Sequence, residues 1–407
     1  MDTARFDRLA RFIGTRADRR TLLGGLAALL SGSLAIPTRD ADAKKKRCGD
    51  CKKSVKGKCK PKKDGSSCKG GTCQKGKCKA GGKCVPNKKP GANFTVSGRQ
   101  ILDPNGNPVL LRGVNKMFLY DQDDPTGVHT LPEIAKSKSN TVRIVWGIAS
   151  DQGQTNLGVL ESLIVNARDN HLLPMIELHD ATGDWSGLGR LVNYWTQPKV
   201  AQLITKYQHI LLINIGNEVG DSSVTDQQFI KGYTDAVKKM RCAGIHTPLV
   251  IDAPDFGKNL EALDRTAGAL LAADPDRNLI FSVHTYWGIS DGANAGFIKN
   301  QLDAAELAGF ALIVGEFSKW GAYNANGSMC EGDGEVDYVS ILRETHQRSI
   351  GWYAWEWGPG NEYNDAKCAV MNMTTNGTYA SLQPAGWARE TAVTSPYSIW
   401  NNAQPII

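Results

Sequence analysis

Two glutamates stand at the ends of strongly apolar runs, where an ionisable side chain is unexpected. Glu218 follows the segment Leu-Leu-Ile-Asn-Ile-Gly-Asn217, and Glu316 follows Leu-Ile-Val-Gly315. Burying a carboxylate in such surroundings costs free energy unless the group has a purpose. A carboxyl group held there can donate or accept a proton during a reaction. We therefore take Glu218 and Glu316 as candidate catalytic residues.

Other polar or aromatic side chains occupy similar positions at the ends of apolar runs. They are Arg143, His179, Asp180, Asn217, His284, Tyr286 and Trp355. Because polar groups interrupt the runs at these places, a single site that uses them together is the hypothesis that the sequence favours. Glu177 and Glu356 lie close by in the sequence and are interpreted as supporting groups.

Eight short apolar runs would have to position these residues. Each run is apolar without alternation, which is typical of a strand buried on both faces. The runs cover residues 109–114, 141–146, 173–179, 210–218, 248–253, 279–286, 311–317 and 351–357. Just before them, Asp103-Pro-Asn-Gly106-Asn separates two β-prone segments and predicts a hairpin.

Amphipathic segments separate the runs and predict helices. Leu160, Leu163, Ile164 and Ala167 follow helical spacing, as do Phe229, Tyr233, Val237 and Met240, and Gly244 is placed to end the second helix. Eight parallel strands with crossover helices predict an α/β fold, the (β/α)8 TIM barrel, whose catalytic groups lie at the C-terminal ends of the strands. A doubly wound open sheet is disfavoured because no Gly-rich phosphate loop follows the first strand.

Taken together, these residues resemble glycoside hydrolase family 5, the cellulase and β-mannanase family of retaining barrel glycosidases. The resemblance rests on Ile-Asn-Ile-Gly-Asn217-Glu218, Ser-Val-His284-Thr-Tyr286, Ile-Val-Gly-Glu316-Phe and Trp355, in this order over residues 94–365. The segment Glu-Leu-His179-Asp-Ala-Thr-Gly and the surroundings of Glu316 are more similar to the bacterial β-mannanase branch than to typical cellulases.

The resemblance implies a role for each glutamate. Glu218 would be the acid/base and would need a drier environment than its partner, and Glu316 would be the nucleophile. Arg143 and Tyr286 would hold Glu316 ionised and aimed. A retaining mechanism requires the two carboxyl groups to be about 5–5.5 Å apart, whereas inversion needs about 6.5–9.5 Å.

The resemblance also implies how sugar is bound. Asn217 would donate to the sugar 2-hydroxyl, His179 and His284 would bind sugar or orient the glutamates, and Trp355 would lie under the reacting sugar. Trp146, Trp287 and Trp320 are candidate platforms for sugar rings, although core packing is an equal alternative for Trp146 and Trp287. We expect no cofactor and no metal, because the sequence has neither an H-x-H pair on the first strand nor an HExxH helix.

The N-terminal part of the chain has a different composition. Residues 44–89 contain 18 Lys or Arg and two acidic residues, whereas the chain from residue 90 onward is net negative. Seven of the ten cysteines also lie in this segment, which has almost no large apolar side chain. A disulfide knot, a disordered basic spacer and a metal site are the three alternatives.

The first 43 residues predict export. Arg19 and Arg20 precede an apolar run, and Ala41-Asp-Ala43 is typical of a cleavage site, so residues 1–43 resemble a twin-arginine signal peptide. We expect residues 44–90 to be a basic Cys-rich segment or linker and residues 91–407 to be the catalytic domain. The mature protein would be a monomer, extracellular or associated with the cell wall, with no membrane segment after cleavage.

The remaining cysteines lie in the large domain. Cys330 and Cys368 fall in the loops after the seventh and eighth strands, which are neighbours in a barrel, and we predict a disulfide between them. Cys242 is expected to be a buried free thiol on a helix.

The sequence thus predicts an exported endo-β-1,4-glycanase that hydrolyses β-mannan, with Glu218 and Glu316 as its catalytic pair. A β-1,4-glucanase of the same family and a non-catalytic carbohydrate-binding barrel are the alternatives. The basic segment could bind anionic cell-wall polymers; nucleic acid is disfavoured as a partner because aromatic residues do not alternate with the lysines.

Overall fold

A computed structural model describes most of the chain. The described residues are 48–49, 51–55, 58–63, 67–68, 71–80, 93–148, 156–321, 330–332, 334–363 and 366–407. They fall into two compact units, divided between residues 85 and 86. The predicted export signal, residues 1–43, lies outside the described residues.

The N-terminal unit is a small β structure held by disulfides. Strands β1 (Lys52–Val55) and β2 (Lys58–Pro61) form a hairpin, and β3 (Ser67–Cys68), β4 (Gly71–Gln74) and β5 (Lys77–Ala80) form an antiparallel sheet. Disulfides join Cys48 to Cys59 and Cys51 to Cys73. Crosslinks here replace the apolar core that the composition cannot provide. Of the three alternatives, the disulfide knot is confirmed.

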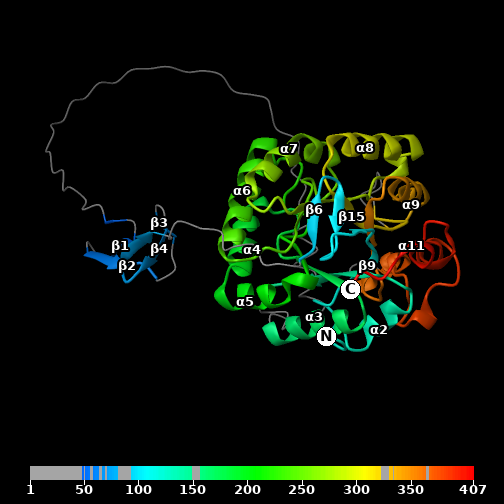
Figure 1. The fold of residues 1–407 in the computed structure, drawn as a ribbon, viewed down its shortest axis with the longest axis horizontal. Coiled ribbons are helices and arrows are strands. Elements are labelled where there is room, and N and C mark those ends of the chain that lie inside the picture. Colours follow the sequence, from blue (N-terminus) through cyan, green and yellow to red (C-terminus); the bar gives the residue numbers. More distant parts are fainter. Residues whose placement is uncertain are drawn as a thin grey trace, which may run out of the picture. The chain divides into compact units, whose positions relative to one another are not determined.

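The large unit contains a closed barrel of eight parallel strands, with neighbours in the order β10-β11-β12-β13-β14-β15-β16-β9. Figure 1 shows helices packed around these strands. The predicted (β/α)8 fold is confirmed. The strands are β9 (Arg112–Lys116), β10 (Thr141–Trp146), β11 (Leu173–Leu178), β12 (Leu212–Asn214), β13 (Leu249–Asp252), β14 (Leu279–His284), β15 (Leu312–Phe317) and β16 (Gly351–Ala354).

The outer helices bury the residues that the helical spacing selected. In α3 the four residues Leu160, Leu163, Ile164 and Ala167 are all buried. A capping box formed by Thr225 and Gln228 begins α6. The helices are α2 (Thr130–Ala135), α3 (Leu157–Asp169), α4 (Leu188–Trp195), α5 (Pro198–Tyr207), α6 (Asp226–Cys242), α7 (Leu260–Ala273), α8 (Ala295–Ala308), α9 (Tyr338–Gln347), α10 (Trp387–Arg389) and α11 (Ile399–Asn402).

The barrel interior is apolar at the N-terminal ends of its strands. A cluster of inward-facing side chains fills this end, and Phe94 and Ile101 join it from the preceding antiparallel sheet, β6 (Thr95–Ser97), β7 (Gln100–Leu102) and β8 (Pro108–Val109). The predicted hairpin is therefore present, with Asp103 accepting the backbone N–H groups of Asn105 and Asn107 in its turn. Polar side chains are left to the opposite end of the barrel, where a site can form.

Two expectations need correction. Residue 109 belongs to β8, and the first barrel strand begins at Arg112, because the chain must first complete the small sheet. Cys242 is disulfide-bonded and exposed, so it is not a buried free thiol; it follows the buried Arg241 at the end of α6, on the solvent side of that helix. The predicted disulfide between Cys330 and Cys368 is confirmed.

Within the described part of the chain, no helix combines enough length and apolar character to cross a membrane.

Candidate active site

The two candidate glutamates converge inside the barrel from opposite sides. Glu218 follows β12 and Glu316 lies on β15. One carboxylate oxygen of each, together with a ring nitrogen of His284, lies within 4.8 Å of the others. This spacing fits the close pair of carboxyl groups, about 5–5.5 Å apart, that a retaining glycosidase requires.

Each glutamate has its own hydrogen-bond partners. Glu316 Oε1 accepts from Arg143 Nη1 at 2.8 Å, and Glu316 Oε2 accepts from the Tyr286 hydroxyl at 3.0 Å. Glu218 Oε1 is 2.8 Å from His284 Nδ1, which is also 3.6 Å from Glu316 Oε1. Among the described residues, Glu218, His284 and Glu316 form the one group placed to ligate a metal. Within this group, Glu218 Oε1 and His284 Nδ1 are hydrogen-bonded to each other.

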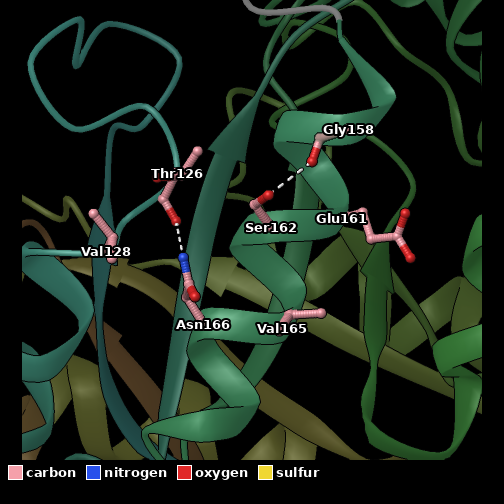
Figure 2. A pocket seen from close by; sticks show the side chains of 7 residues that line it. All are labelled: Thr126, Val128, Gly158, Glu161, Ser162, Val165 and Asn166. Carbon is pink, nitrogen blue, oxygen red and sulfur yellow. Dashed lines mark hydrogen bonds between the residues drawn. The ribbon is translucent and has the colours of Figure 1, made fainter.

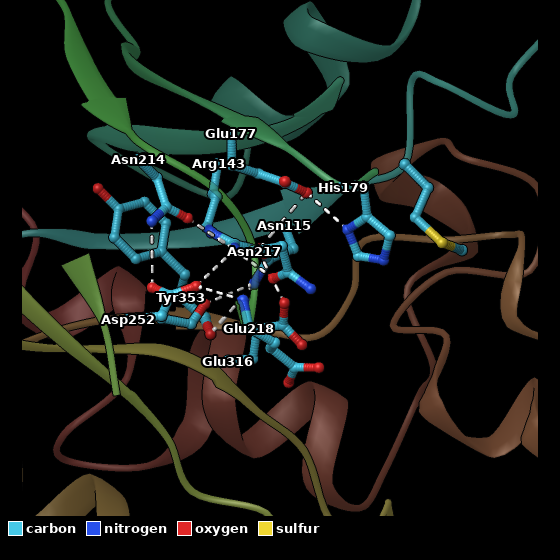
Figure 3. Close-up of polar contacts among 12 residues, drawn as sticks. Asn115, Arg143, Glu177, His179, Asn214, Asn217, Glu218, Asp252, Glu316 and Tyr353 are labelled. Carbon is cyan, nitrogen blue, oxygen red and sulfur yellow. Dashed lines mark hydrogen bonds and ion pairs between the residues drawn. The ribbon is translucent and has the colours of Figure 1, made fainter. Parts of the chain in front are cut away.

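Arg143 is the buried centre of this cluster (Figure 3). Its guanidinium donates at 2.6–2.9 Å to side-chain oxygens on β9, on β12 and the segment just after it, and on β15: Asn115, Asn214, Asn217 and Glu316. Burial alone would lower the pKa of Arg143, but Glu177, Glu316 and Asp252 outweigh burial and raise it. Arg143 is therefore a permanent positive charge that links the two catalytic strands.

A β-bulge aims Glu316 into the barrel. Val283 pairs with Val314, yet the next residue of β14, His284, pairs with Glu316, so Gly315 is the extra residue. Without it, strict alternation from the inward-facing Ile313 would point Glu316 at the helices. A side chain at residue 315 is excluded, because a Cβ would lie 2.3 Å from Ser282 Oγ. Asn115 Nδ2 donates to the Gly315 carbonyl at 3.0 Å and ties the bulge to β9.

Burial and neighbouring charges shift the pKa values of Glu316 and His284, and the two glutamates differ in exposure. Burial raises the pKa of Glu316, although His284 and Arg143 act in the opposite direction. Burial disfavours the charged form of His284, yet Glu316, Asp252 and Glu218 outweigh it and raise its pKa to about 9. The expectation that Glu218 is drier than Glu316 is wrong, because its side chain is 13 % exposed and that of Glu316 is 5 % exposed. Glu316 lies deeper because the bulge turns it inward.

His179 and Trp355 form a second part of the site. The His179 ring lies parallel to Trp355, with centroids 6.3 Å apart and an interplanar angle of 19°. His179 Nδ1 is 2.9 Å from Glu177 Oε1, and this carboxylate outweighs the effect of burial and raises the pKa of His179. Trp355 Nε1 donates to Asn361 Oδ1 at 2.8 Å. Each ring is thus held by a hydrogen bond to a polar partner of its own.

The three tryptophans considered as sugar platforms differ in how deeply they are buried. Trp146 is fully buried, with its Nε1 donating to the Tyr194 hydroxyl. Trp287 is 9 % exposed and packs edge-on against Phe297. Both contribute to the core between barrel and helices, so these two platform predictions are wrong. Trp320 is half-buried beside Trp355 in the cluster at the catalytic end, where it remains a candidate.

Three further buried polar residues belong to the site and were not among the candidates selected from the sequence. Asn115, Asn214 and Asp252 lie on β9, β12 and β13 and are at most 1 % exposed. Asn115 and Asn214 accept from Arg143, and Asp252 lies 3.7 Å from it. Each interrupts an apolar run, so the rule that found Glu218 could have found these residues as well.

The predicted disulfide lies at the edge of the site. Cys330 and Cys368 belong to a cluster with Met371, Trp355 and the partly buried Trp320. The bond joins loops 38 residues apart in sequence, which follow β15 and β16. It therefore restrains the loops that carry Trp355 and Trp320.

A hollow elsewhere on the large unit is not part of this site. Figure 2 shows it between α3 and the segment before α2. It has a volume of about 400 Å³ and is open to solvent. None of the catalytic candidates lines it; its residues are Thr126, Val128, Gly158, Glu161, Ser162, Val165 and Asn166.

Glu356 is a buried carboxyl group next to Trp355 that does not face the catalytic pair. Its Oε2 accepts from the Met117 backbone N–H at 3.0 Å, and its other oxygen has no hydrogen-bond partner among the described residues. Burial raises its pKa to about 7, although Lys116 and Met117 oppose the shift. Glu356 is thus a supporting group, as the sequence predicts.

Comparison with protein families gives a match over most of the barrel. Residues 102–361 match the family model described as cellulase (glycosyl hydrolase family 5). This segment begins in β7 and ends just after β16, so it contains every residue of the site described above.

Individual proteins that are similar to this chain are a mannan endo-1,4-β-mannosidase and two β-mannanases. The chain is 32% identical over 268 residues to a mannan endo-1,4-β-mannosidase of Salipaludibacillus agaradhaerens, covering 65% of this chain and 82% of that protein. The β-mannanase of Streptomyces thermolilacinus superposes with a TM-score of 0.66 at 25% identity, over 77% of this chain and 98% of that one. A mannohexaose complex of the Thermomonospora fusca β-mannanase gives a TM-score of 0.65 at 25% identity, with the same coverage.

The raised pKa of Glu356 predicts a pH-dependent stability. A carboxyl group with a raised pKa in the folded protein stabilises the fold below its ordinary value, 4.5, and this contribution is lost as the pH rises to about 7. Glu356→Gln keeps the neutral form at every pH. We expect it to match the wild type in thermal unfolding at pH 4 and to be more stable by about 2–3 kcal/mol at pH 8.

A matched control should change in the opposite direction. Hydrogen bonds from Arg343 and Arg348 outweigh burial and lower the pKa of Glu344, so Glu344→Gln should lose more stability at pH 8 than at pH 4. Equal behaviour of Glu356→Gln and the wild type across this range would contradict the assignment.

Proposed function

The chain belongs to glycosyl hydrolase family 5, and on that premise we propose that Glu218 and Glu316 hydrolyse β-mannan by a retaining double displacement. The protein is an endo-acting mannan endo-1,4-β-mannosidase. The observation that carries this mechanism is the approach of the two carboxylates, with one oxygen of each within 4.8 Å of the other.

The contacts of each carboxylate suit a different step. Glu316, between the Arg143 guanidinium and the Tyr286 hydroxyl, attacks the anomeric carbon and forms a glycosyl-enzyme. Glu218 protonates the departing glycosidic oxygen and then takes a proton from the water that hydrolyses the intermediate. The greater exposure of Glu218 serves these exchanges with the leaving group and water.

The neighbouring groups stabilise the oxocarbenium-like transition state. Asn217 Oδ1 is fixed by Arg143 at 2.6 Å and its Nδ2 by Thr182 Oγ1 at 3.0 Å, so its amide is held ready for the sugar 2-hydroxyl. A hydrogen bond to that hydroxyl strengthens as the transition state develops. Trp355, parallel to His179, offers an apolar floor to the reacting sugar.

The relatives favour mannan as the substrate. They are a mannan endo-1,4-β-mannosidase and β-mannanases, one of them in complex with mannohexaose. The family model itself is described as cellulase, which keeps β-1,4-glucan as the second candidate. Glucose and mannose differ at one hydroxyl group, so both would fit the same catalytic pair.

Removing either glutamate should abolish hydrolysis of mannan. We expect Glu218→Ala and Glu316→Ala to lower kcat/KM on β-mannan by about 10³-fold or more, while Glu261→Ala, an exposed carboxylate on α7, retains full activity. Release of reducing sugar from mannan, glucomannan and carboxymethyl-cellulose, assayed in parallel, measures both activity and substrate preference.

The outcomes of this assay separate the alternatives. Activity on carboxymethyl-cellulose alone would transfer the mechanism to β-glucan. Binding of mannan without hydrolysis by the wild type would indicate a non-catalytic carbohydrate-binding barrel. Unchanged activity of either alanine variant would remove that glutamate from the mechanism.

We further propose that residues 1–43 direct export and that residues 44–90 retain the mature protein at an anionic cell wall. The density of lysine in residues 44–89 and the net negative charge of the remaining chain support this separation of roles. The disulfides of Cys48 and Cys51 fit an oxidising compartment. Lys52, Lys53, Lys58 and Lys60 are exposed on the hairpin and available to polyanions.

Removing the positive charges of the β1–β2 hairpin tests its role in retention without disturbing its disulfides. We expect Lys52→Gln, Lys53→Gln, Lys58→Gln and Lys60→Gln, combined, to weaken retention on isolated anionic cell walls while leaving kcat/KM on soluble mannan unchanged. Deletion of residues 44–90 should abolish retention, and high salt should release the wild type because it screens charge. Loss of catalysis after deletion, or retention insensitive to salt, would contradict the proposal.

A further inference from the structure

Asp252 is a buried carboxylate that contacts the backbone of Glu218 and lies next to His284, the hydrogen-bond partner of the Glu218 side chain. It ends β13 and its side chain is fully buried. Oδ1 accepts from Asn214 Nδ2 at 3.2 Å, and Oδ2 accepts from the backbone N–H of Glu218 at 3.0 Å. Oδ2 also lies 3.6 Å from His284 Nε2 and 3.7 Å from Arg143 Nη2. Figure 3 shows Asp252 close to Asn214, Arg143 and Glu218.

The backbone of Glu218 is where Asp252 acts most directly. Glu218 has a φ of +46°, a left-handed conformation that side chains other than glycine rarely adopt. Such a conformation persists only where its surroundings fix it. The Glu218 N–H is held by Asp252 and its carbonyl by the N–H of Gly183, at 3.0 and 2.8 Å. The direction of the Glu218 side chain therefore depends on Asp252.

His284 gives Asp252 a second route to Glu218. The ring lies between the two carboxylates, with Nδ1 at 2.8 Å from Glu218 and Nε2 at 3.6 Å from Asp252. The imidazolium carries a proton on both nitrogens, so a carboxylate on the Nε2 side favours the form in which Nδ1 donates to Glu218. The charged groups facing His284 are Glu218, Asp252 and Glu316, of which Asp252 and Glu316 are also paired with Arg143.

We propose that Asp252 is a positioning residue for proton transfer by Glu218: it fixes the backbone of Glu218 and orients His284, and does not contact the sugar. This inference rests on the proposed role of Glu218 as acid/base. It concerns only the step that uses the Glu218 proton, because Glu316 keeps its own contacts with Arg143 and Tyr286.

Leaving-group dependence tests the proposal. Asp252→Asn keeps the shape but removes the charge, and we expect kcat/KM on mannohexaose to fall by about 10²-fold, in line with a loss of general-acid catalysis. A 2,4-dinitrophenyl β-mannobioside releases 2,4-dinitrophenolate, a stable anion that needs no proton when its bond to the sugar breaks. Its kcat/KM should therefore fall by no more than about threefold. Glu218→Ala provides the reference pattern, with the same selectivity and a larger loss on mannohexaose.

Asp274→Asn is the matched control. Asp274 is also fully buried and paired with an arginine, Arg241, but it lies outside the catalytic cluster. It should lower the unfolding temperature without changing the ratio of kcat/KM between the two substrates. A purely structural role for Asp252 would give the same result, with losses that are equal on both substrates, and would overturn the proposal.

A second readout follows His284 itself. The midpoint of its titration, measured by NMR in the wild type, should move to lower pH in Asp252→Asn because one of its facing carboxylates is neutralised. An unchanged midpoint would also overturn the proposal. Failure of the proposed function is distinguishable, since the wild type and Glu218→Ala would then show no difference on mannohexaose.

Discussion

The interior of the barrel is organised by one buried cation. The Arg143 guanidinium has no access to solvent, and an uncompensated charge in such a place would cost far more than the fold can supply. Glu177, Glu316 and Asp252 compensate this charge, and hydrogen bonds to Glu316 and three asparagines fix side chains of three other strands. Because the carboxylates that compensate this buried charge include Glu316, the catalytic geometry and the stability of the barrel depend on the same interaction.

The rest of the structure separates stability from chemistry along the barrel axis. Apolar side chains fill the N-terminal end and the space beneath the helices, whereas polar groups are concentrated at the C-terminal end. At that end the backbone departs from regular geometry at the two residues that matter most: a bulge at Gly315 turns Glu316 inward, and a left-handed φ directs Glu218. Local strain of this kind can persist because the surrounding core over-determines the backbone.

Much of this arrangement was predictable from the sequence, for physical reasons. Strands buried on both faces are continuous apolar runs, so their polar interruptions mark the site, as Glu218, Glu316 and Arg143 do. Alternation along β10 could also have shown that Trp146, three residues after Arg143, faces the helices. The inward direction of Glu316 could not be predicted, because a bulge is encoded only by Gly315 and its neighbours in space. Asp252 interrupts an apolar run and could have been selected, but its contacts with the Glu218 backbone and His284 join residues distant in sequence and could not be predicted.

The central claim is that Glu316 forms a covalent bond to the sugar while Glu218 handles the proton. Incubation with a 2-deoxy-2-fluoro-β-mannosyl fluoride slows the second step of a double displacement and allows the intermediate to accumulate. We predict one label per molecule by intact mass, located on the peptide that contains Glu316 and released when an acceptor sugar is added. A label on Glu218, or hydrolysis with inversion and no label at all, would contradict the account.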